Sequence, residues 1–225
     1  MNTLNKNKIR YIPVQKKKRE ETYLKKISNK FKYGLVLQAI RNQLVRFGIV
    51  ITPFYWVQEG INCTKVPEIK GAFSDFTVEF LEAKDFKIID ENVHGYSEAL
   101  LLGDLREGNL CLGLKHNDEI ASFMWINLKE CSFTPIKKPL KVDEAYLTSM
   151  HTIESFRGNN LAPYLRYKSY EILKKMGHDK IYSVSEYFNS SAIKYKKKLD
   201  AKNLKLVLYI QLFKRLEWSF TLREY

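Results

Sequence analysis

The residues from Arg157 to Ala162 combine one cation, one glycine and two asparagines in the order Arg-Gly-Asn-Asn-Leu-Ala. Glycine and asparagine tolerate positive φ better than other residues, so this stretch can turn sharply. Apolar residues then recur at spacings of four and seven between Leu161 and Met176, which indicates that a helix begins here. The first N–H groups of a helix lack intrahelical partners and lie at the positive end of its dipole. The stretch therefore predicts an anion site that suits a phosphate.

The residues before this stretch favour a strand. Residues 142–153 are rich in β-branched and aromatic side chains and contain no Gly or Pro. We therefore predict a strand, a tight turn and a helix in succession, with Met150, His151 and Thr152 at the end of the strand.

This arrangement resembles the acyl-CoA loop of the GNAT N-acetyltransferases, whose pattern is Arg/Gln-x-x-Gly-x-Gly/Ala. Arg157 and Ala162 match the two ends, and Asn160 stands where the family has its middle Gly. The resemblance implies that backbone N–H groups from Gly158 to Ala162 hold the diphosphate of acetyl-CoA and that Arg157 acts as a charged clamp. It also implies that the arm of acetyl-CoA pairs with the strand at residues 150–152.

A second local match lies further along the chain. The stretch Asn189-Ser190-Ser191-Ala192 resembles the family's Asn-x-x-Ala, which places the Asn beside the pantetheine arm. By itself the stretch is equally typical of an Asn that caps a short helix. The residues that the resemblance assigns to acetyl-CoA are Met150, His151, Thr152, Arg157, Gly158, Asn159, Asn160, Leu161, Ala162 and Asn189.

The implied reaction passes an acyl group directly from the CoA sulfur to a primary amine, so the amine must first lose a proton. Glu144 lies thirteen residues before Arg157, the spacing at which some family members carry their base. A loop that differs in length by two residues would move this correspondence to Tyr146, on the same face of the strand. Glu186 and His151 are alternatives, and Glu144 is otherwise an ordinary strand-end carboxylate.

The family often places a tyrosine seven residues after the helix Asn, as the acid for the departing thiolate. In this chain that position is Lys196, and Tyr195 precedes it. One residue along a helix corresponds to about 100° of rotation. Either the helix start shifts and Tyr195 serves as the acid, or the thiolate leaves without a side-chain acid. Glu144 and Tyr195 are thus the catalytic residues that we predict.

Periodicity and turn residues predict the elements around the site. Strands are expected over 49–57, 76–81, 110–114, 120–128, 142–153, 180–185, 204–213 and 216–222, and helices over 96–106, 161–176 and 189–199. Pro53 predicts an edge or a bulge in the first strand, and residues 131–141, with two prolines, predict a loop. From residue 110 the order β, β, β, α, β, α, β, β resembles the GNAT fold. That fold is α/β (α+β), with a mixed, mostly antiparallel twisted sheet flanked by helices.

The formal charge of +13 is concentrated at the N-terminus, where residues 1–32 hold eleven Lys and Arg against two Glu. We expect a flexible basic arm over 1–22, an accessory helix and strand over 23–70, and a GNAT-like acyltransferase domain over 71–225. The accessory helix spans 24–47, with an interruption at Gly34, and is basic and amphipathic. It is expected to pack on the core, and contact with a membrane surface or a second copy of the chain is the alternative.

The predicted function is transfer of an acetyl or short acyl group from acyl-CoA to the primary amine of a small molecule such as an amino sugar. The basic character of the chain repels basic peptides, which puts protein amines second. The alternatives are a protein N-acetyltransferase, or a GNAT-like binding module with weakened catalysis whose arm contacts nucleic acid or an anionic membrane.

Three cysteines, Cys63, Cys111 and Cys131, show no Cys-x-x-Cys spacing and are odd in number. Neither a disulfide framework nor a metal site is therefore predicted. No apolar run approaches the roughly 18 residues of a membrane span, and the N-terminus lacks the apolar region of a signal peptide. We expect a cytoplasmic protein with reduced, buried thiols.

Overall fold

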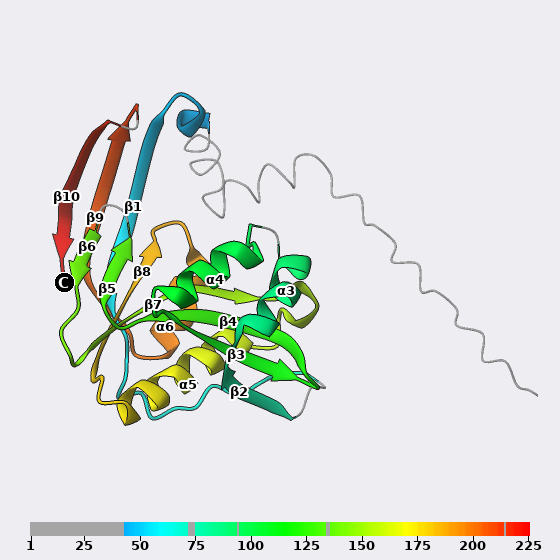
Figure 1. Cartoon of the computed structure of the whole chain (residues 1–225). Coiled ribbons are helices and arrows are strands. Elements are labelled where there is room, and N and C mark those ends of the chain that lie inside the picture. The colour runs from blue at the N-terminus through cyan, green and yellow to red at the C-terminus, as the bar shows by residue number, and fades with distance from the viewer. Residues whose placement is uncertain (1–42, 72–74, 94, 134–135, 214) are drawn as a thin grey trace, which may run out of the picture. The chain divides into compact units, whose positions relative to one another are not determined.

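The structure is a computed structural model, and it describes residues 43–71, 75–93, 95–133, 136–213 and 215–225 (Figure 1). The predicted arm over 1–22 and most of the predicted helix over 24–47 lie outside the described residues.

Strands from both ends of the described chain form one sheet. Its strands are β1 (Ile49–Gln58), β2 (Phe76–Phe80), β3 (Leu110–His116), β4 (Glu119–Asn127), β7 (Glu144–Thr152), β8 (Lys180–Glu186), β9 (Lys202–Leu212) and β10 (Leu216–Glu224). Within the described ranges their order is β10-β9-β1-β8-β7-β4-β3-β2. Every neighbouring pair is antiparallel except β7 and β8, which are parallel. The predicted mixed, mostly antiparallel sheet is confirmed.

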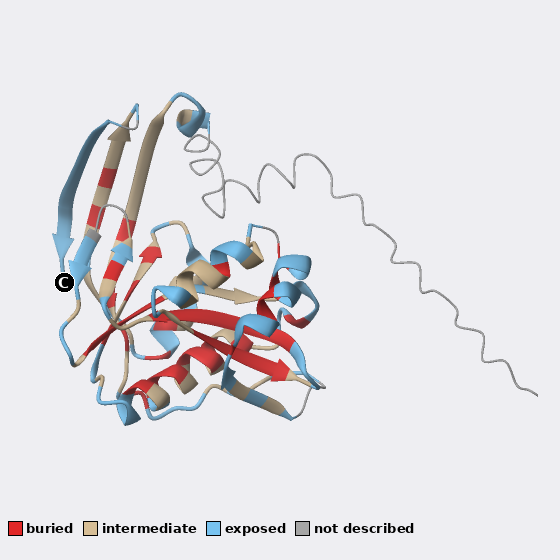
Figure 2. Cartoon of the chain, in the orientation of Figure 1, coloured by how far each residue is buried: buried red, intermediate tan, exposed pale blue. Residues whose placement is uncertain are grey.

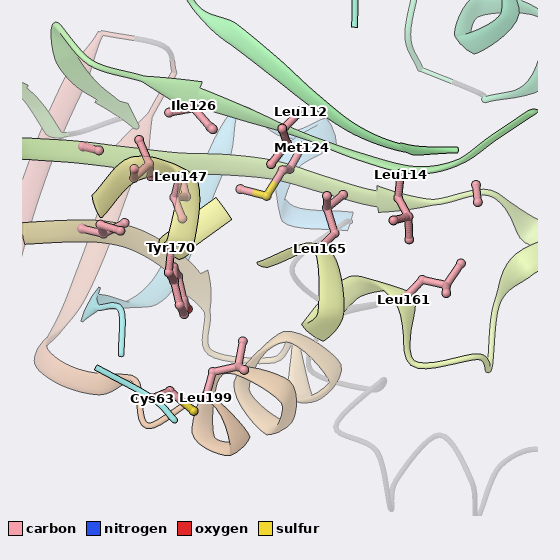
Figure 3. Packing of buried hydrophobic residues seen from close by; sticks show 14 of the residues in the cluster. Cys63, Leu112, Leu114, Met124, Ile126, Leu147, Leu161, Leu165, Tyr170 and Leu199 are labelled. Atoms are coloured by element: carbon pink, nitrogen blue, oxygen red, sulfur yellow. The ribbon is translucent and has the colours of Figure 1, made fainter. Parts of the chain in front are cut away.

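Helices cover both faces of this sheet (Figure 1). They are α3 (Ala83–Asn92), α4 (Glu98–Arg106), α5 (Leu161–Lys175) and α6 (Ser190–Lys198). We call the face under α3 and α4 the front face, where Phe123 and Trp125 belong to the core cluster of these helices. On the back face, Met124 and Leu147 pack with Leu165 of α5 (Figure 3). Buried residues are concentrated in β3, β4 and α5, whereas β10 is exposed along its whole length (Figure 2).

Helix α3 is an element that the sequence did not predict. A capping box at its start holds the turn, because the Asp85 carboxylate accepts the N–H of Glu82 at 2.9 Å. Phe86 and Ile89 are buried against the sheet, while the rest of this short helix is largely charged. Two apolar anchors in ten residues are too few for the periodicity to stand out.

The prediction of a loop over residues 131–141 is wrong, as this segment shows. It contains a two-stranded hairpin, β5 (Glu130–Phe133) and β6 (Ile136–Pro139), that pairs apart from the main sheet. Pro139 is tolerated because it is the last residue of a strand whose only described partner is β5. The hairpin lies on the front face, where the Phe133 and Phe54 ring centroids are 5.0 Å apart.

Strand β1 lies inside the sheet, paired with β8 on one side and with β9 on the other. The Pro53 carbonyl accepts the N–H of Tyr187 at 2.9 Å, so the missing N–H of Pro53 belongs on the β8 side, one residue before the pairing with β8 begins at Phe54. The nitrogen of Pro53 does not face β9, so the proline removes no hydrogen bond from the β1–β9 ladder. The sheet crosses the boundary predicted between residues 70 and 71, because β1 joins strands from the C-terminal third of the chain.

Cys63, Cys111 and Cys131 are buried free thiols, as predicted. Among the described residues, no helix is long and apolar enough to cross a membrane.

Candidate functional site

The parallel pairing of β7 and β8 is short, running from Glu144 opposite Lys180 to Leu147 opposite Ser183. Beyond this point β7 continues along β4 and β8 continues along β1, so the two strands separate. A cavity of about 780 Å³ opens between them. The backbone of residues 148–152 consequently has β4 on one edge and the cavity on the other. Such an edge presents peptide groups to any ligand that carries amides.

A β-bulge shapes this edge of β7. Phe123 pairs with His151 and Trp125 with Thr148, so two residues of β7, Ser149 and Met150, face one residue of β4. Ser149 has a positive φ of 51°. Bulges turn peptide groups and side chains away from the regular ladder, and this one lies in the wall of the cavity.

The turn at the far end of β7 has the predicted form. After a 3₁₀ turn, η1 (Glu154–Phe156), Gly158 and Asn160 adopt positive φ values of 90° and 63°, and α5 begins at Leu161. Among the described residues no side chain caps α5. Gly158, Asn160, Leu161 and Ala162 line the cavity, so the positive end of the α5 dipole lies at its wall.

Side-chain hydrogen bonds hold this turn in place. The Arg157 Nε donates to the Thr152 carbonyl at 3.1 Å, which sets the guanidinium beside the end of β7. The Asn160 Nδ2 donates to the Glu68 carbonyl at 2.6 Å. The Asn159 Nδ2 donates to the Phe156 carbonyl at 3.1 Å, and Asn159 is the one predicted ligand residue of the turn that does not line the cavity.

We expect Asn160→Ala to lower the free energy of unfolding by about 1.5 to 3 kcal/mol. The variant loses the bond to Glu68 and keeps a positive φ that alanine tolerates poorly. Asn160→Gly loses the same bond but relieves the backbone, so we expect a change below about 1 kcal/mol. Urea denaturation of the two variants measures both values. Equal losses would mean that the backbone at this position does not require positive φ.

Aromatic side chains and one carboxylate line the front side of the cavity. Tyr146 is buried with its ring stacked on Trp56, the centroids being 6.2 Å apart. Burial raises the pKa of the Tyr146 hydroxyl, which therefore stays protonated. Glu186, at the end of β8, adds the carboxylate. Burial, followed by the charge of Arg157, lowers the pKa of His151, so this cavity residue is neutral at pH 7.

The structure does not bring Glu144 to the cavity. This residue is 4% exposed, and its carboxylate accepts the Lys141 N–H at 3.1 Å. It lies opposite Lys180, where β7 and β8 are still paired, three residues before the strands separate. The alternatives considered from sequence, Tyr146, Glu186 and His151, all line the cavity.

The back side of the cavity is formed by α5, α6 and the buried face of β8. The Asn189 Oδ1 accepts the Ala192 N–H at 3.0 Å, so Asn189 caps α6, and it also lines the cavity. Tyr195 also lines the cavity. Burial raises the pKa of Tyr195, although the charge of Arg166 opposes this. The cations in the lining are Arg157, Arg166, Lys194, Lys196 and Lys198. This excess of positive charge favours an anionic ligand.

A buried charged cluster supports the back side. Glu59, directly after β1, is 3% exposed, and its carboxylate lies 3.4 Å from the Arg166 guanidinium and 3.6 Å from the Lys196 ammonium. The hydroxyls of Tyr170 and Ser183 donate to the same carboxylate. Burial alone would raise the pKa of Glu59, but the two cations and the two hydroxyls hold it below its ordinary value.

Sequence reasoning assigned no role to Glu59 or Arg166. The signal available was a glutamate at the end of an apolar strand and an arginine on the apolar side of a helix. Buried charges of this kind need partners. Which residues become partners depends on the place of β1 in the sheet, and that place is not visible in the sequence.

Neither a protein-family model nor a curated protein sequence matches this chain. Its structure is similar to a GNAT-family protein from Novosphingobium aromaticivorans, with a TM-score of 0.52 and 17% identity over 73% of this chain and 66% of that one. An acetyltransferase of the GNAT family from Colwellia psychrerythraea gives a TM-score of 0.52 and 13% identity over 72% of this chain and 57% of that one.

A glucosamine N-acetyltransferase region of a fungal multi-domain β-N-acetylglucosaminidase gives a TM-score of 0.53 and 9% identity over 78% of this chain and 23% of that one. The chain thus covers less than two thirds of each of these three structures. At such identities the likeness concerns the fold, and the chain has the GNAT fold.

Proposed function

We propose that this chain is an acyl-CoA-dependent N-acyltransferase that moves an acetyl or short acyl group to the primary amine of a small molecule. The observation that carries the proposal is the separation of β7 and β8 into a cavity that ends at the uncapped start of α5. One cavity thus offers a strand edge for an amide-containing arm and a positive helix end for a diphosphate.

The lining residues fit acyl-CoA along the whole cavity. Residues 158–162 and the Arg157 guanidinium would hold the diphosphate, since a turn with two positive φ values directs backbone N–H groups toward one anion. The cavity-facing edge of residues 148–152 would pair with the amides of the pantetheine arm. Bound acyl-CoA supplies the thioester that is attacked.

The front side fits the acceptor amine. A primary amine is protonated at neutral pH, and it must become neutral before it attacks a carbonyl carbon. Glu186 would take this proton, directly or through a water, and the aromatic wall formed with Tyr146 would shield the reacting atoms from bulk solvent. The two substrates would then approach from opposite faces of the sheet.

A thiol-release assay with acetyl-CoA and a panel of amines tests the proposed activity. Glucosamine is the first probe, because the cavity is rich in cations and a compact sugar lacks the repeated positive charge of a lysine-rich peptide. We expect thiol release that depends on the amine and favours the sugar. Release with peptides alone would instead favour a protein N-acetyltransferase. Bound acetyl-CoA without release in the presence of any amine would favour a binding module.

We expect Arg157→Ala to raise the dissociation constant of acetyl-CoA about 10-fold or more, because a charge-assisted contact to phosphate is worth about 1.5 to 3 kcal/mol. Lys175→Ala, which removes an exposed cation at the other end of α5, is the matched control and should leave the constant unchanged. Isothermal titration calorimetry measures both. Equal constants for the two variants would place the diphosphate away from this turn.

A further inference from the structure

Lys196 is a buried lysine at the point where β7 and β8 separate. It is 4% exposed, yet it lines the cavity from the back side. Its Nζ donates to the Ser185 Oγ at 2.7 Å, to the Ser183 Oγ at 2.6 Å and to the Val184 carbonyl at 3.1 Å. All three ammonium protons therefore have acceptors on β8.

Ser185 connects this lysine to the cavity. The residue is 3% exposed and belongs to the cavity lining. Because the Ser185 Oγ accepts a hydrogen bond from Lys196, its own proton can be donated to another atom. Lysine, serine and cavity thus form a short path for a proton.

The surroundings of Lys196 make proton release feasible. The titratable groups around it are Glu59 after β1, Arg166 and Tyr170 on α5, and Tyr195 on α6. Burial lowers the pKa of Lys196, and the positive charge of Arg166 lowers it further. The negative charge of Glu59 raises it, and the resulting pKa is about 8. At neutral pH the group is still mostly protonated, and it gives up its proton far more readily than an exposed lysine does.

The fold determines which part of acyl-CoA comes near Ser185. The diphosphate would lie at residues 158–162, at the far end of the exposed edge of β7. An arm that follows this edge from there runs toward Thr148, next to the last β7–β8 pair. The thioester would then lie at the end where Val184, Ser185 and Lys196 line the cavity.

We propose, on the basis of the proposed function, that the Ser185 hydroxyl protonates the departing thiolate and that Lys196 replaces this proton. The amine nitrogen forms a bond to the carbonyl carbon, the carbon–sulfur bond breaks, and its electron pair goes to sulfur. The sulfur takes the proton of Ser185 while the Ser185 oxygen takes one from the Lys196 Nζ, which is left neutral. The protons lost by the amine nitrogen leave on the front side, and Lys196 regains its proton from solvent.

Two features of the cluster favour a chemical role over a purely structural one. Arg166 already lies 3.4 Å from the Glu59 carboxylate and can neutralise it, so a second cation is not needed for that purpose. Lys196 is instead held by two hydroxyls on the strand that borders the cavity. Its place opposite Glu186 would separate the acid on the back face from the base on the front face.

The pH dependence of kcat tests the proposal with acetyl-CoA and an active amine. In the wild type the protonated lysine is the working form, so kcat should fall as the pH rises through about 8. Lys196→Arg keeps a cation beside Glu59 but does not release a proton in this range. We expect its kcat to be about 100-fold lower, with no fall near pH 8, and the KM for acetyl-CoA to stay within about threefold.

Further variants complete the test. Ser185→Ala should lower kcat to a similar extent, and Ser185→Thr, which keeps a hydroxyl, should have a kcat between those of Ser185→Ala and the wild type. Lys197→Arg, on the exposed side of α6, is the control and should behave as the wild type. The proposal is overturned if Lys196→Arg keeps both kcat and the fall near pH 8, or if Tyr195→Phe removes that fall. No turnover by the wild type despite bound acetyl-CoA would overturn the proposed function, and this inference with it.

Discussion

Glu59→Ala should lower the free energy of unfolding by about 3 to 5 kcal/mol. The variant removes one carboxylate from a buried cluster and leaves two cations, Arg166 and Lys196, without their counter-charge. Breaking a buried ion pair from one side costs this much because the remaining charge stays desolvated. The hydroxyls of Tyr170 and Ser183 lose their acceptor at the same time. Urea denaturation at pH 7 measures the loss.

Glu171→Ala is the matched control for Glu59→Ala. It removes a carboxylate whose partner, Lys168, lies 2.7 Å away on the surface of α5. Pairs of this kind on a helix surface contribute about 0.5 kcal/mol or less. A loss from Glu59→Ala as small as that from Glu171→Ala would contradict the account of the buried cluster.

The same carboxylate predicts acid lability. Its pKa in the folded chain lies below the ordinary value of 4.5, so its contribution to stability is present above pH 4.5 and is lost as the pH falls through the folded pKa. The Glu59→Gln variant lacks this titration. Its free energy of unfolding should therefore depend less on pH below 4.5 than that of the wild type.

Glu186→Gln should lower kcat about 100-fold at neutral pH and leave the dissociation constant of acetyl-CoA nearly unchanged. The glutamine keeps the shape of the side chain but cannot take a proton from the acceptor amine, and a positioned general base contributes about 10² to 10⁴ in rate. The thiol-release assay under saturating substrates measures kcat.

Glu144→Gln is the informative comparison for Glu186→Gln. Glu144 lies before the separation of the strands and accepts a backbone N–H at 3.1 Å, a bond that the amide oxygen of glutamine can retain. We expect its kcat to match the wild type. A large loss in Glu144→Gln with a normal rate in Glu186→Gln would contradict the assignment of the base to the end of β8.

Local patterns predicted the turn at the core of the site. The positive φ of Asn160 and the start of α5 at Leu161 follow from residue types that are adjacent in the chain. The cap by Asn189 was the alternative interpretation of residues 189–192, and it is also local, because the side chain binds the N–H three residues later. The strand and helix that flank the turn were predicted to within two residues at each end.

Contacts between distant parts of the chain account for what was missed. The place of β1 between β8 and β9 depends on pairings across more than 120 residues, and the hydrophobic pattern of one strand does not specify its neighbours. Glu59 reaches Arg166 and Lys196 only because of this place.

Glu144 lies outside the cavity for a related reason. A spacing of thirteen residues before Arg157 pointed to Glu144, but the position at which the parallel ladder ends decides which side chains reach the cavity. That position depends on the register of β7 against β8 and on the bulge opposite Met124. The spacing alone contains neither.

Calorimetric titration of acetyl-CoA into the full chain tests the central claim, that the cavity between β7 and β8 is an acyl-CoA site. The account predicts saturable binding of one acetyl-CoA per chain with a dissociation constant below about 1 mM, which corresponds to at least about 4 kcal/mol of binding free energy. It also predicts that this binding weakens in Arg157→Ala. No detectable binding at millimolar acetyl-CoA, in a sample that circular dichroism shows to be folded, would contradict the claim.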